Sequence, residues 1–584
     1  MARKLPEVDV VLVGFGWTAA MLGQELTDAG LSVLAIERGA WRDTSTDFAV
    51  TFAQDELRFY WRYAMFQEPS RETLTFRNKP GQTALPMRHL GSFLPATGVG
   101  GAGIHWNGQT WRFLPSDFVA RTHNTDRYGP LPADMTVQDW SVTYDELEPF
   151  YDRFEYICGI SGKAGNIKGA IQEGGNPFEG ARARDYPNPP LDMAYAPTVF
   201  ADAARSLGHK PFPCPAANMS RPYTNPLGVQ LGPCTYCGFC EKFGCGNYSK
   251  SSPQTTILPV LMRKENFELR TECEVLRIEH DGKRATGVGY VDAQGQEWEQ
   301  PAQLVVLCAF PLHNTRLMLL SKIGKPYDPA TGDGVIGKNY AYQIVSSVDV
   351  FFDDKIMNPF VGAGALGVGI DEFNGDNFDH GGLGFIGGGY LACWNTGGRP
   401  IEFHPVPKGT PSWGGAWKKA VAKNYLTTLS IATHGAVMSH RNNYLDLDPT
   451  YRDVYGRPLM RLTFDYTENE HRMSDYLTDR ATDIANAMNA REIHVKKRSG
   501  AYSIVPYQTT HNTGGVIMGA DPKSSAVNRY LQSWDLHNLF VMGASAFPQN
   551  AGYNPTGTVG ALTYWAADAI RTKYLKAPGP LVQA

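Results

Sequence analysis

The 584-residue sequence contains no apolar run long enough for a membrane-spanning helix. Such a helix takes about 20 consecutive apolar residues, whereas the longest candidates, such as Leu304–Phe310, have the length of a buried strand. The N-terminus enters a predicted strand at Val8, with no separate apolar stretch ending in a small-residue cleavage site. We therefore expect neither a transmembrane segment nor a signal peptide. This pattern fits a cytoplasmic protein, and equally a folded protein that is exported together with a signal-bearing partner.

The sequence also lacks a block of basic residues. It has 54 Lys and Arg against 58 Asp and Glu, a net charge of −4. Nucleic acid is therefore not an expected partner. Charged residues make up only 19% of the chain and apolar residues 42%, the balance of a folded globular protein. The length allows two sizeable cores, or one elaborate α/β enzyme with a large insertion.

The N-terminal segment carries the pattern of a dinucleotide-binding fold. Val8–Val13 is a β-branched run typical of a strand buried on both faces, and a G-x-G-x-x-A turn (Gly14, Gly16, Ala19) follows it. Ala20–Ala29 is predicted to be a helix and Leu31–Ile36 a second strand. The two glycines permit a tight turn and close approach to a pyrophosphate, Ala19 permits close helix–strand packing, and the acid that ends the second strand suits ribose hydroxyls. That acid is Glu37.

Three further stretches distinguish FAD from NAD. The loop 98–108 (GVGGAGIHWNG) has a glycine density that suits backbone lying against a flat ring or a diphosphate. Near the C-terminus, Asn538–Pro548 reads as a buried strand followed by small residues, and a helix over Gly560–Thr572 follows GYNPT. The segment before them reads QTTHNTGGVIMG, with His511 as its histidine.

With these motifs the chain resembles the glucose–methanol–choline (GMC) flavin oxidoreductases nearly from end to end. The middle of the chain agrees: Phe267–Leu276 and Ala285–Val291 are predicted as paired strands, followed by Leu304–Phe310 and Thr315–Ser321. Within the family it is most similar to flavoprotein subunits of bacterial dehydrogenases that oxidise gluconate, 2-ketogluconate, sorbitol or fructose. These proteins share the HWNG-like loop, the cysteine cluster, the NYLDLDPTY segment and the GYNPTG helix start.

The resemblance implies an α/β (α+β) fold, in which a Rossmann-like FAD-binding domain is interleaved with an antiparallel-sheet substrate-binding domain. The expected boundaries are 1–345 for the FAD-binding domain, with a cluster-bearing segment 228–250 inserted, 346–504 for the substrate-binding domain, and 505–584 for the return to the FAD-binding domain with the catalytic residues. The expected FAD-binding residues are Gly14, Gly16, Ala19, Glu37, Gly98, Gly100, Gly101, His105, Trp106, Asn107, Gly543, Ala544, Asn554, Pro555 and Thr556.

Alcohol oxidation needs a base for the hydroxyl proton and an acceptor for the hydride. Histidine suits the base because its pKa of about 6.5 lets it exchange a proton near neutrality. The resemblance gives this role to His511, and gives Asn554 the orientation of the substrate oxygen. Asn554 also precedes a proline at a helix start, so a helix N-cap is an alternative reading that is compatible with the first. For His105, the alternatives are a covalent bond to the flavin methyl group and simple packing on the ring edge.

Four of the nine cysteines lie within twelve residues, in the spacing C-x2-C-x2-C-x4-C. A structural zinc site usually has two cysteine pairs a dozen or more residues apart. This compact run instead suits an iron–sulfur cluster. Relatives with a cluster here carry a three-iron centre, which would use Cys234, Cys240 and Cys245; a four-iron cluster that includes Cys237 is the alternative. Such a cluster passes electrons singly, which favours a dehydrogenase over an oxidase.

We therefore expect an FAD-dependent dehydrogenase that oxidises a secondary alcohol of a sugar acid or polyol, with gluconate at carbon 2 as the first substrate to test. The resemblance implies two partners, a small signal-bearing subunit and a membrane-bound multihaem cytochrome c, on the periplasmic face of the inner membrane. The rivals are a soluble GMC-type oxidase in which the cluster is structural, and a lyase in which the flavin is a bystander. Arg399, His404 and Arg441 are candidate ligands for a carboxylate, although ordinary surface positions suit each of them better.

Overall fold

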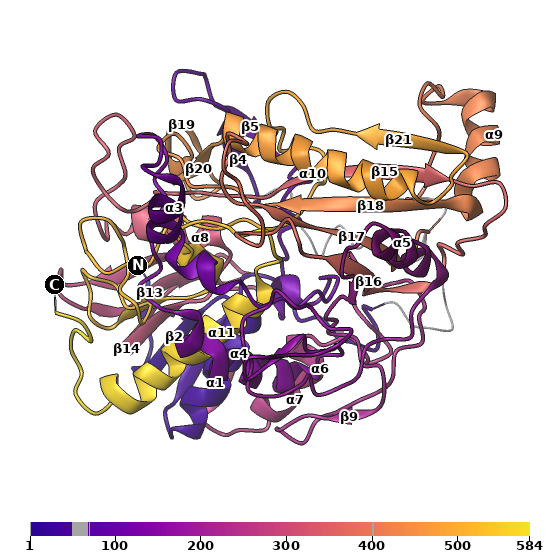
Figure 1. Cartoon of the computed structure of the whole chain (residues 1–584). Coiled ribbons are helices and arrows are strands. Elements are labelled where there is room, and N and C mark those ends of the chain that lie inside the picture. Colours follow the sequence, from indigo (N-terminus) through magenta and orange to yellow (C-terminus); the bar gives the residue numbers. More distant parts are fainter. Residues whose placement is uncertain (1, 49–67, 69–70, 400–401, 584) are drawn as a thin grey trace.

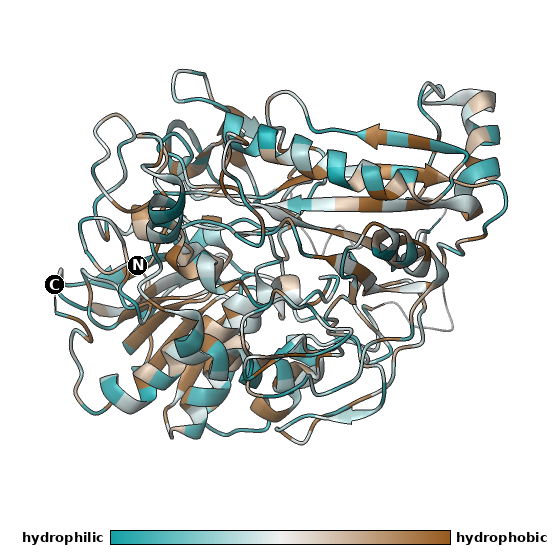
Figure 2. Cartoon of the chain, viewed as in Figure 1, coloured by the Kyte–Doolittle hydropathy of each residue, from teal (hydrophilic) through white to brown (hydrophobic). Residues whose placement is uncertain are grey.

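The computed structural model describes residues 2–48, 68, 71–399 and 402–583. Its first large sheet has a parallel core in the spatial order β11, β3, β2, β14, β22. These strands are β11 (Phe267–Arg270), β3 (Val33–Ile36), β2 (Val8–Val13), β14 (Glu297–Leu307) and β22 (Leu539–Val541). Strands β2, β3 and β22 and the last four residues of β14 are almost wholly apolar, as expected for a sheet covered on both faces (Figure 2), whereas β11 carries Glu268 and Arg270. The dinucleotide-binding core predicted from residues 8–37 is thus formed.

The long strand β14 joins this core to an antiparallel extension. Its second half pairs with β2 and β22, while its first half pairs with β13 (Ala285–Val291), which in turn pairs with β12 (Glu274–His280). Two-residue β1 (Arg3–Lys4) also joins β14. The prediction of one strand over Phe267–Leu276 was wrong, because the chain breaks between β11 and β12 at Glu272, whose φ is +56°. The two pieces pair with different neighbours.

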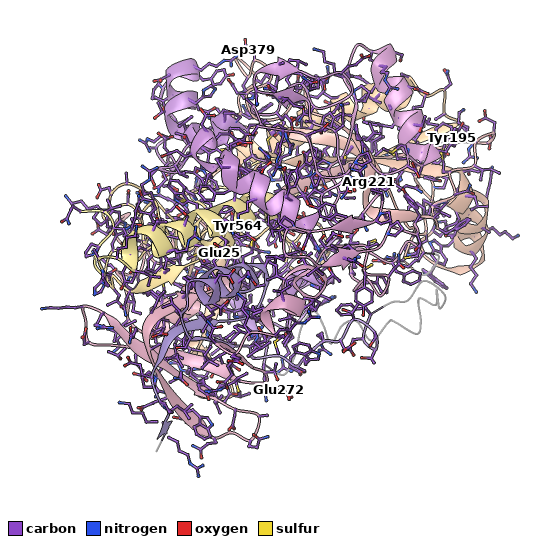
Figure 3. The ribbon with its side chains drawn as sticks, turned by 90° about the horizontal axis from the view of Figure 1, so that it is seen from below. Glu25, Tyr195, Arg221, Glu272, Asp379 and Tyr564 are labelled. Carbon is purple, nitrogen blue, oxygen red and sulfur yellow. The ribbon has the colours of Figure 1, made fainter. Side chains whose placement is uncertain are left out.

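Helices close one side of this sheet. Helix α1 (Trp17–Asp28) connects β2 to β3, and α11 (Thr556–Ala569) packs against both α1 and α4 (Tyr144–Cys158). Glu25 and Tyr564 lie close together (Figure 3), because Arg153 of α4 forms an ion pair with Glu25 and stands 4.5 Å from the centre of the Tyr564 ring. Three segments far apart in sequence are thereby fixed to one another.

The segment Thr315–Ser321, expected after the strand 304–310, belongs mainly to helix α8 (Pro311–Leu320) and is not a further strand. Pro311 supplies the fixed φ that suits the first helical position, and the Phe310 backbone before it is extended. A short apolar run does not by itself distinguish strand from helix. The sequence pattern left the type of this segment open, and the structure makes it helical.

A second sheet of six strands is antiparallel throughout. In spatial order it contains β21 (Glu492–Lys496), β15 (Ile344–Phe351), β18 (Thr428–Gly435), β17 (Gly389–Thr396), β16 (Gly362–Ile370) and β8 (Phe212–Pro213). Helix α10 (Glu468–Asn486) covers one face (Figure 1). A capping box of Thr467 and Glu470 starts this helix, and a buried stripe that includes Leu477 and Ile484 faces the strands. The predicted α/β class, with one parallel and one antiparallel sheet, is confirmed.

The remaining elements connect and cover the two sheets. A four-stranded sheet has the order β19 (Tyr444–Arg452), β20 (Pro458–Thr463), β4 (Leu74–Arg77), β5 (Leu85–Met87), and two hairpins comprise β6 (Asn166–Ile167), β7 (Ala170–Ile171), β9 (Tyr223–Thr224) and β10 (Gln230–Leu231). The other helices are α3 (Ala120–Tyr128), α5 (Tyr195–Ser206), α6 (Pro253–Thr256), α7 (Leu258–Leu261) and α9 (Gly414–Asn424), with short 3-10 or π turns at Gly101–Gly103, Pro115–Val119, Tyr425–Thr427, Gly543–Ala546 and Ile570–Tyr574.

One buried charge network lies beside α4. Glu155 is 1% exposed, and its carboxylate accepts two hydrogen bonds of 2.8 Å from the Arg112 guanidinium and one from Arg182. We predict that Glu155→Gln lowers the free energy of unfolding by about 3–5 kcal/mol, since it removes the buried counter-charge that Arg112 and Arg182 share and leaves Arg112 with Glu148 at 3.0 Å and Arg182 with Glu179 at 3.6 Å. Chemical denaturation of the holoprotein measures this loss. The control Asp202→Asn, at an exposed ion pair with Arg205, is expected to change stability by less than about 1 kcal/mol; a similar loss in both variants would contradict the prediction.

Candidate active site

Two glycine-rich loops meet backbone to backbone beyond the end of β2. The N–H of Gly100 donates to the Phe15 carbonyl oxygen at 2.7 Å, and a Cβ atom on Gly101 would lie only 3.2 Å from the Gly16 Cα. Gly14 and Gly100 have φ values of +85° and +98°, which side-chain-bearing residues rarely adopt. Glycine is therefore required where the loops cross, and bare backbone is left facing the space beside them.

That space is a cavity of about 520 Å³, which is the size of a ligand site. Both glycine loops, the ends of β2 and β3, and the two C-terminal motifs line it. The expected site residues on its wall are Gly14, Gly16, Glu37, Gly101, His105, Trp106, Asn107, His511, Gly543, Ala544, Asn554, Pro555 and Thr556. The expected residues that do not line it are Ala19, Gly98, Gly100, Cys234, Cys237, Cys240 and Cys245. Motifs separated by more than 500 residues thus converge on one cavity.

Glu37 ends β3 at the wall of this cavity and is 6% exposed. Its two carboxylate oxygens accept the backbone N–H groups of Phe15 at 2.9 Å and Gly39 at 2.8 Å. Burial raises the pKa of Glu37 above its ordinary value of 4.5, and these hydrogen bonds act in the opposite direction. The carboxylate therefore ties the first glycine turn to the end of β3, and its remaining lone pairs can accept from hydroxyl groups of a ligand.

His511 and Asn554 come together at another part of the cavity wall. The Nε2 atom of His511 lies 3.1 Å from the Asn554 amide nitrogen. An amide nitrogen is only a donor, so Nε2 must carry the lone pair and the ring proton must be on Nδ1. Burial, and to a smaller degree the nearby His434, hold the pKa of His511 well below its ordinary 6.5. His511 is therefore a neutral imidazole with its basic nitrogen beside Asn554.

Gln343 fixes this state from the other side of the ring. Its amide nitrogen donates to the carbonyl oxygens of Ala551, Gly552 and Tyr553 at 2.7–3.0 Å. These contacts turn the amide oxygen toward His511, whose Nδ1 lies 2.5 Å away. The His511 Nδ1–H donates to this oxygen, so one buried amide sets both the tautomer and the direction of the imidazole. Sequence reasoning missed Gln343, which lies in no recognised motif.

Tyr390 of β17 orients Asn554, the partner of His511. Its hydroxyl lies 2.7 Å from the Asn554 amide oxygen and 2.9 Å from the Gln109 side-chain oxygen, and its ring stacks on His434 at 5.2 Å. With its oxygen bound to Tyr390, Asn554 directs its nitrogen at His511. Burial lowers the pKa of His434 to about 4, so a second neutral imidazole lines the cavity here.

The alternative reading of Asn554 as the N-cap of α11 was wrong. The helix begins at Thr556, the capping position is Pro555, and no side chain caps the first turn. The Asn554 amide is instead used by His511 and Tyr390. The expected helix over Gly560–Thr572 starts four residues earlier, so its N-terminus opens on the cavity wall formed by Asn554, Pro555 and Thr556.

His105 and Trp106 belong to the second glycine loop and face the cavity. His105 is 4% exposed; burial, followed by the charge of Lys250, lowers its pKa to about 3. Trp106 donates its indole N–H to the Ser251 carbonyl oxygen at 2.7 Å and packs edge-on against Trp17 at 5.7 Å. His105 is therefore neutral and held in place, which suits either packing against a ring or bonding to it.

The four clustered cysteines lie behind this loop, and all are free thiols. In the part of the chain that the structure describes, no group of three or more His, Cys, Asp or Glu side chains is placed to hold a single metal ion. The four thiols nevertheless lie near enough to influence one another electrostatically. The Asn218 amide nitrogen lies 3.6 Å from Cys240 Sγ and 4.0 Å from Cys234 Sγ, so it donates toward two sulfur atoms.

The three candidates for binding a carboxylate do not line the cavity. Arg399 donates to the carbonyl oxygens of Gly238 and Gly397 and pairs with Glu402. Exposed His404 has its ring 5.5 Å from that of Trp417. Arg441 lies 3.7 Å from Asp134. Exposed His404 and partly exposed Arg441 fit the expected surface positions, whereas Arg399 is buried, against that expectation.

Among the helices in the described ranges, none has both the length and the apolar composition to cross a lipid bilayer.

Comparison with known proteins agrees with the geometry. Residues 217–345 and 439–563 match the N- and C-terminal models of the GMC oxidoreductases. The chain is 51% identical to a gluconate 2-dehydrogenase flavoprotein of Pantoea cypripedii, over 100% of this chain and 97% of that protein. It is 26% identical to a fructose dehydrogenase large subunit of Gluconobacter japonicus, over 98% and 99%.

A solved structure, pyridoxine 4-oxidase from Mesorbium loti, has the same fold, with a TM-score of 0.58 and 16% identity over 97% of this chain and 99% of that one. The chain belongs to the GMC oxidoreductase family and is an FAD-dependent oxidoreductase that acts on a CH–OH group.

Proposed function

We propose that this enzyme oxidises a secondary alcohol of a sugar acid or polyol to the ketone, with D-gluconate to 2-keto-D-gluconate as the first reaction to test. The observation that carries the proposal is the His511–Asn554 pair, held by Gln343 and Tyr390 at the wall of the cavity. Identity of 51% to a protein named gluconate 2-dehydrogenase flavoprotein supports the substrate class.

The cavity fits FAD. The crossing glycine loops leave no room for side chains where a diphosphate would lie, α1 begins there with no acidic residue in its first turn, and Glu37 supplies an acceptor for ribose hydroxyls. Asn107, Gly543, Ala544, Pro555 and Thr556 would line the rest of the cofactor. FAD supplies the acceptor for a hydride when it is bound. We further propose that neutral His105 is the residue that bonds to the flavin methyl group.

Side chains of this enzyme remove the hydroxyl proton of the substrate. The substrate hydroxyl would take the place of the Asn554 N–H at His511 Nε2, so that Asn554 donates to the substrate oxygen and the freed Nε2 lone pair accepts the hydroxyl proton as the hydride leaves the same carbon. The alcohol thus loses one proton and one hydride and becomes a ketone. Gln343 accepts a stronger hydrogen bond from Nδ1–H once the ring becomes positive, which stabilises the imidazolium. The N-terminus of α11 would favour negative charge on the bound cofactor through its helix dipole.

We also propose that Cys234, Cys240 and Cys245 hold a [3Fe-4S] cluster, with a [4Fe-4S] cluster on all four thiols as the alternative. In such clusters each thiolate binds a different iron atom, so the sulfur atoms stand farther apart than around one ion. The compact C-x2-C-x2-C-x4-C spacing supports a cluster rather than zinc, and the Asn218 amide that donates toward Cys234 and Cys240 would serve its sulfur atoms. A cluster supplies one-electron transfer to an outside acceptor, which supports dehydrogenase over oxidase.

The same reasoning extends to the partners. The relative from Gluconobacter japonicus is named as a large subunit, which supports an assembly with further chains. We propose a small signal-bearing subunit and a membrane-bound multihaem cytochrome c, on the periplasmic face of the bacterial inner membrane. We also propose the domain division 1–345, 346–504 and 505–584, with 228–250 as the cluster-bearing insertion.

Replacement of His511 tests the proton acceptor. We predict that His511→Gln slows anaerobic flavin bleaching by gluconate by about 10²–10⁴-fold, because glutamine cannot take the proton. Stopped-flow absorbance measures the rate, and His404→Gln, outside the cavity, is the matched control. Wild-type bleaching is also expected to stay constant as pH falls through 6.5: the folded pKa of His511 is depressed below this value, so the base remains neutral until a lower pH. An undiminished rate in His511→Gln would remove the proposed mechanism.

Gln343 is expected to act through His511 rather than on the substrate. Gln343→Met removes the acceptor of the His511 Nδ1–H and should slow flavin bleaching about 5- to 100-fold, equivalent to about 1–3 kcal/mol. The substrate concentration that half-saturates the bleaching rate should change little. The control for packing is Gln549→Met. Gln549 is a buried amide whose side chain forms hydrogen bonds with the backbone of Gln138 and Asp117. If only the half-saturating substrate concentration changed and the bleaching rate did not, Gln343 would serve substrate binding instead.

Removal of a thiol tests the cluster. We predict that Cys240→Ser loses most of its iron by elemental analysis, retains FAD, and still bleaches with substrate, but that turnover with a one-electron acceptor is lost. Cys393→Ser, a buried thiol of β17 outside the cluster, should keep both iron and turnover. Wild-type protein that contains zinc and no iron would contradict the proposal. Unchanged turnover in Cys240→Ser with fast peroxide formation would favour the oxidase alternative.

A further inference from the structure

Lys250 is a fully buried cation that the sequence motifs do not account for. It is 0% exposed, and its ammonium donates to the carbonyl oxygens of Trp106 at 2.6 Å, Cys240 at 2.7 Å and Phe243 at 2.8 Å. An ammonium group has three N–H donors, and all three are used. One acceptor belongs to the cofactor loop and two belong to the cysteine segment, so a single side chain ties the two together.

The charge of Lys250 has no carboxylate partner at ion-pair distance within the described residues. A buried charge is costly unless it is paired or well hydrogen-bonded. Three carbonyl oxygens satisfy the donors but carry no net charge. The ammonium contacts the backbone of Cys240 directly and lies at the cysteine segment. Burial lowers the pKa of Lys250, and the thiols of this segment together with Glu241 act in the opposite direction. Thiolates of the cysteine segment would therefore supply a counter-charge beside the ammonium.

We propose that Lys250 is the fixed counter-cation of the cysteine centre and the clamp that holds the His105–Trp106 backbone against it. This inference rests on the proposed function, since it assigns thiolates to the segment. Two backbone neighbours strengthen the clamp: the N–H of Lys242 donates to the His105 carbonyl oxygen at 2.8 Å, and Trp106 is bound to Ser251, the residue next to Lys250.

A positive charge between two electron carriers has a definite effect. It stabilises whichever state is more negative, so it favours reduction both of a flavin beside Trp106 and of a centre on the thiolates. Burial makes the effect larger than it would be in water. The same contacts fix the separation between the two carriers. Lys250 is thus a positioning residue, which acts on the reaction without touching the substrate.

Two variants separate charge from packing. Lys250→Met keeps the length of the side chain and removes its charge, Lys250→Arg keeps the charge, and Lys283→Met in an exposed loop is the control. Redox titration of each holoprotein gives the midpoint potentials of flavin and iron centre, and elemental and flavin analysis give their occupancy. We expect Lys250→Met to make reduction of the iron centre at least tenfold less favourable, a fall of 59 mV for one electron, and to lower the flavin potential. Lys250→Arg should stay near wild type.

Potentials that are equal in wild type and Lys250→Met would overturn the proposal. If Lys250→Met loses iron or fails to fold, Lys250→Arg decides: retention of iron and of both potentials supports the role of charge, and a loss equal to that of methionine overturns it. If wild type itself contains no iron, the proposed electron route fails at that point. The flavin potential of Lys250→Met against wild type still tests the charge of Lys250 in that case.

Discussion

The site depends on a crossing of two backbones that carry no side chains. Where Gly16 meets Gly101, a single Cβ atom would push the loops apart, and the space beside them would change shape. Glu37 adds a second restraint, since its carboxylate ties the first turn to the end of β3. Both restraints act over short distances: one is steric contact between backbones, and the other is a pair of buried hydrogen bonds. The parallel sheet fixes the positions of the two loops and therefore maintains these contacts. The cavity is therefore a property of the fold core and not of a surface loop.

The His511–Asn554 pair is held differently, by side-chain hydrogen bonds that fix the orientation of each amide group. Gln343 directs its oxygen at His511 because three carbonyls occupy its nitrogen, and Asn554 directs its nitrogen at His511 because Tyr390 occupies its oxygen. Each amide has one orientation, so the imidazole between them has one tautomer. Burial then keeps that imidazole neutral. Hydrogen-bond counting thus puts the lone pair on His511 Nε2, beside the Asn554 amide at the cavity wall.

Local sequence patterns predicted much of the cavity wall and of the His511 site. The strand at residues 8–13, the glycine turn, Glu37, the glycine-rich loop and His511 were all visible, because each depends on residues a few positions apart. The errors lie where the outcome depends on distant partners. A positive φ at Glu272 divides an apparently continuous strand, and Asn554 bonds to His511 instead of capping α11. Gln343 and Tyr390 could not be found, since an amide or phenol has meaning only once its partners are known.

Lys250 shows the same limit most clearly. In the sequence it is an ordinary lysine five residues after the last clustered cysteine, and lysines are usually solvated. In the fold it is fully buried, and its ammonium donates to three carbonyl oxygens, two of them in the cysteine segment. Burial of a charged ammonium costs free energy, and it is stable only where another interaction offsets that cost. Thiolates offset it if they are present, and their own burial is in turn offset by the ammonium. The cation and the cysteines therefore stabilise one another, and neither is expected at this depth alone.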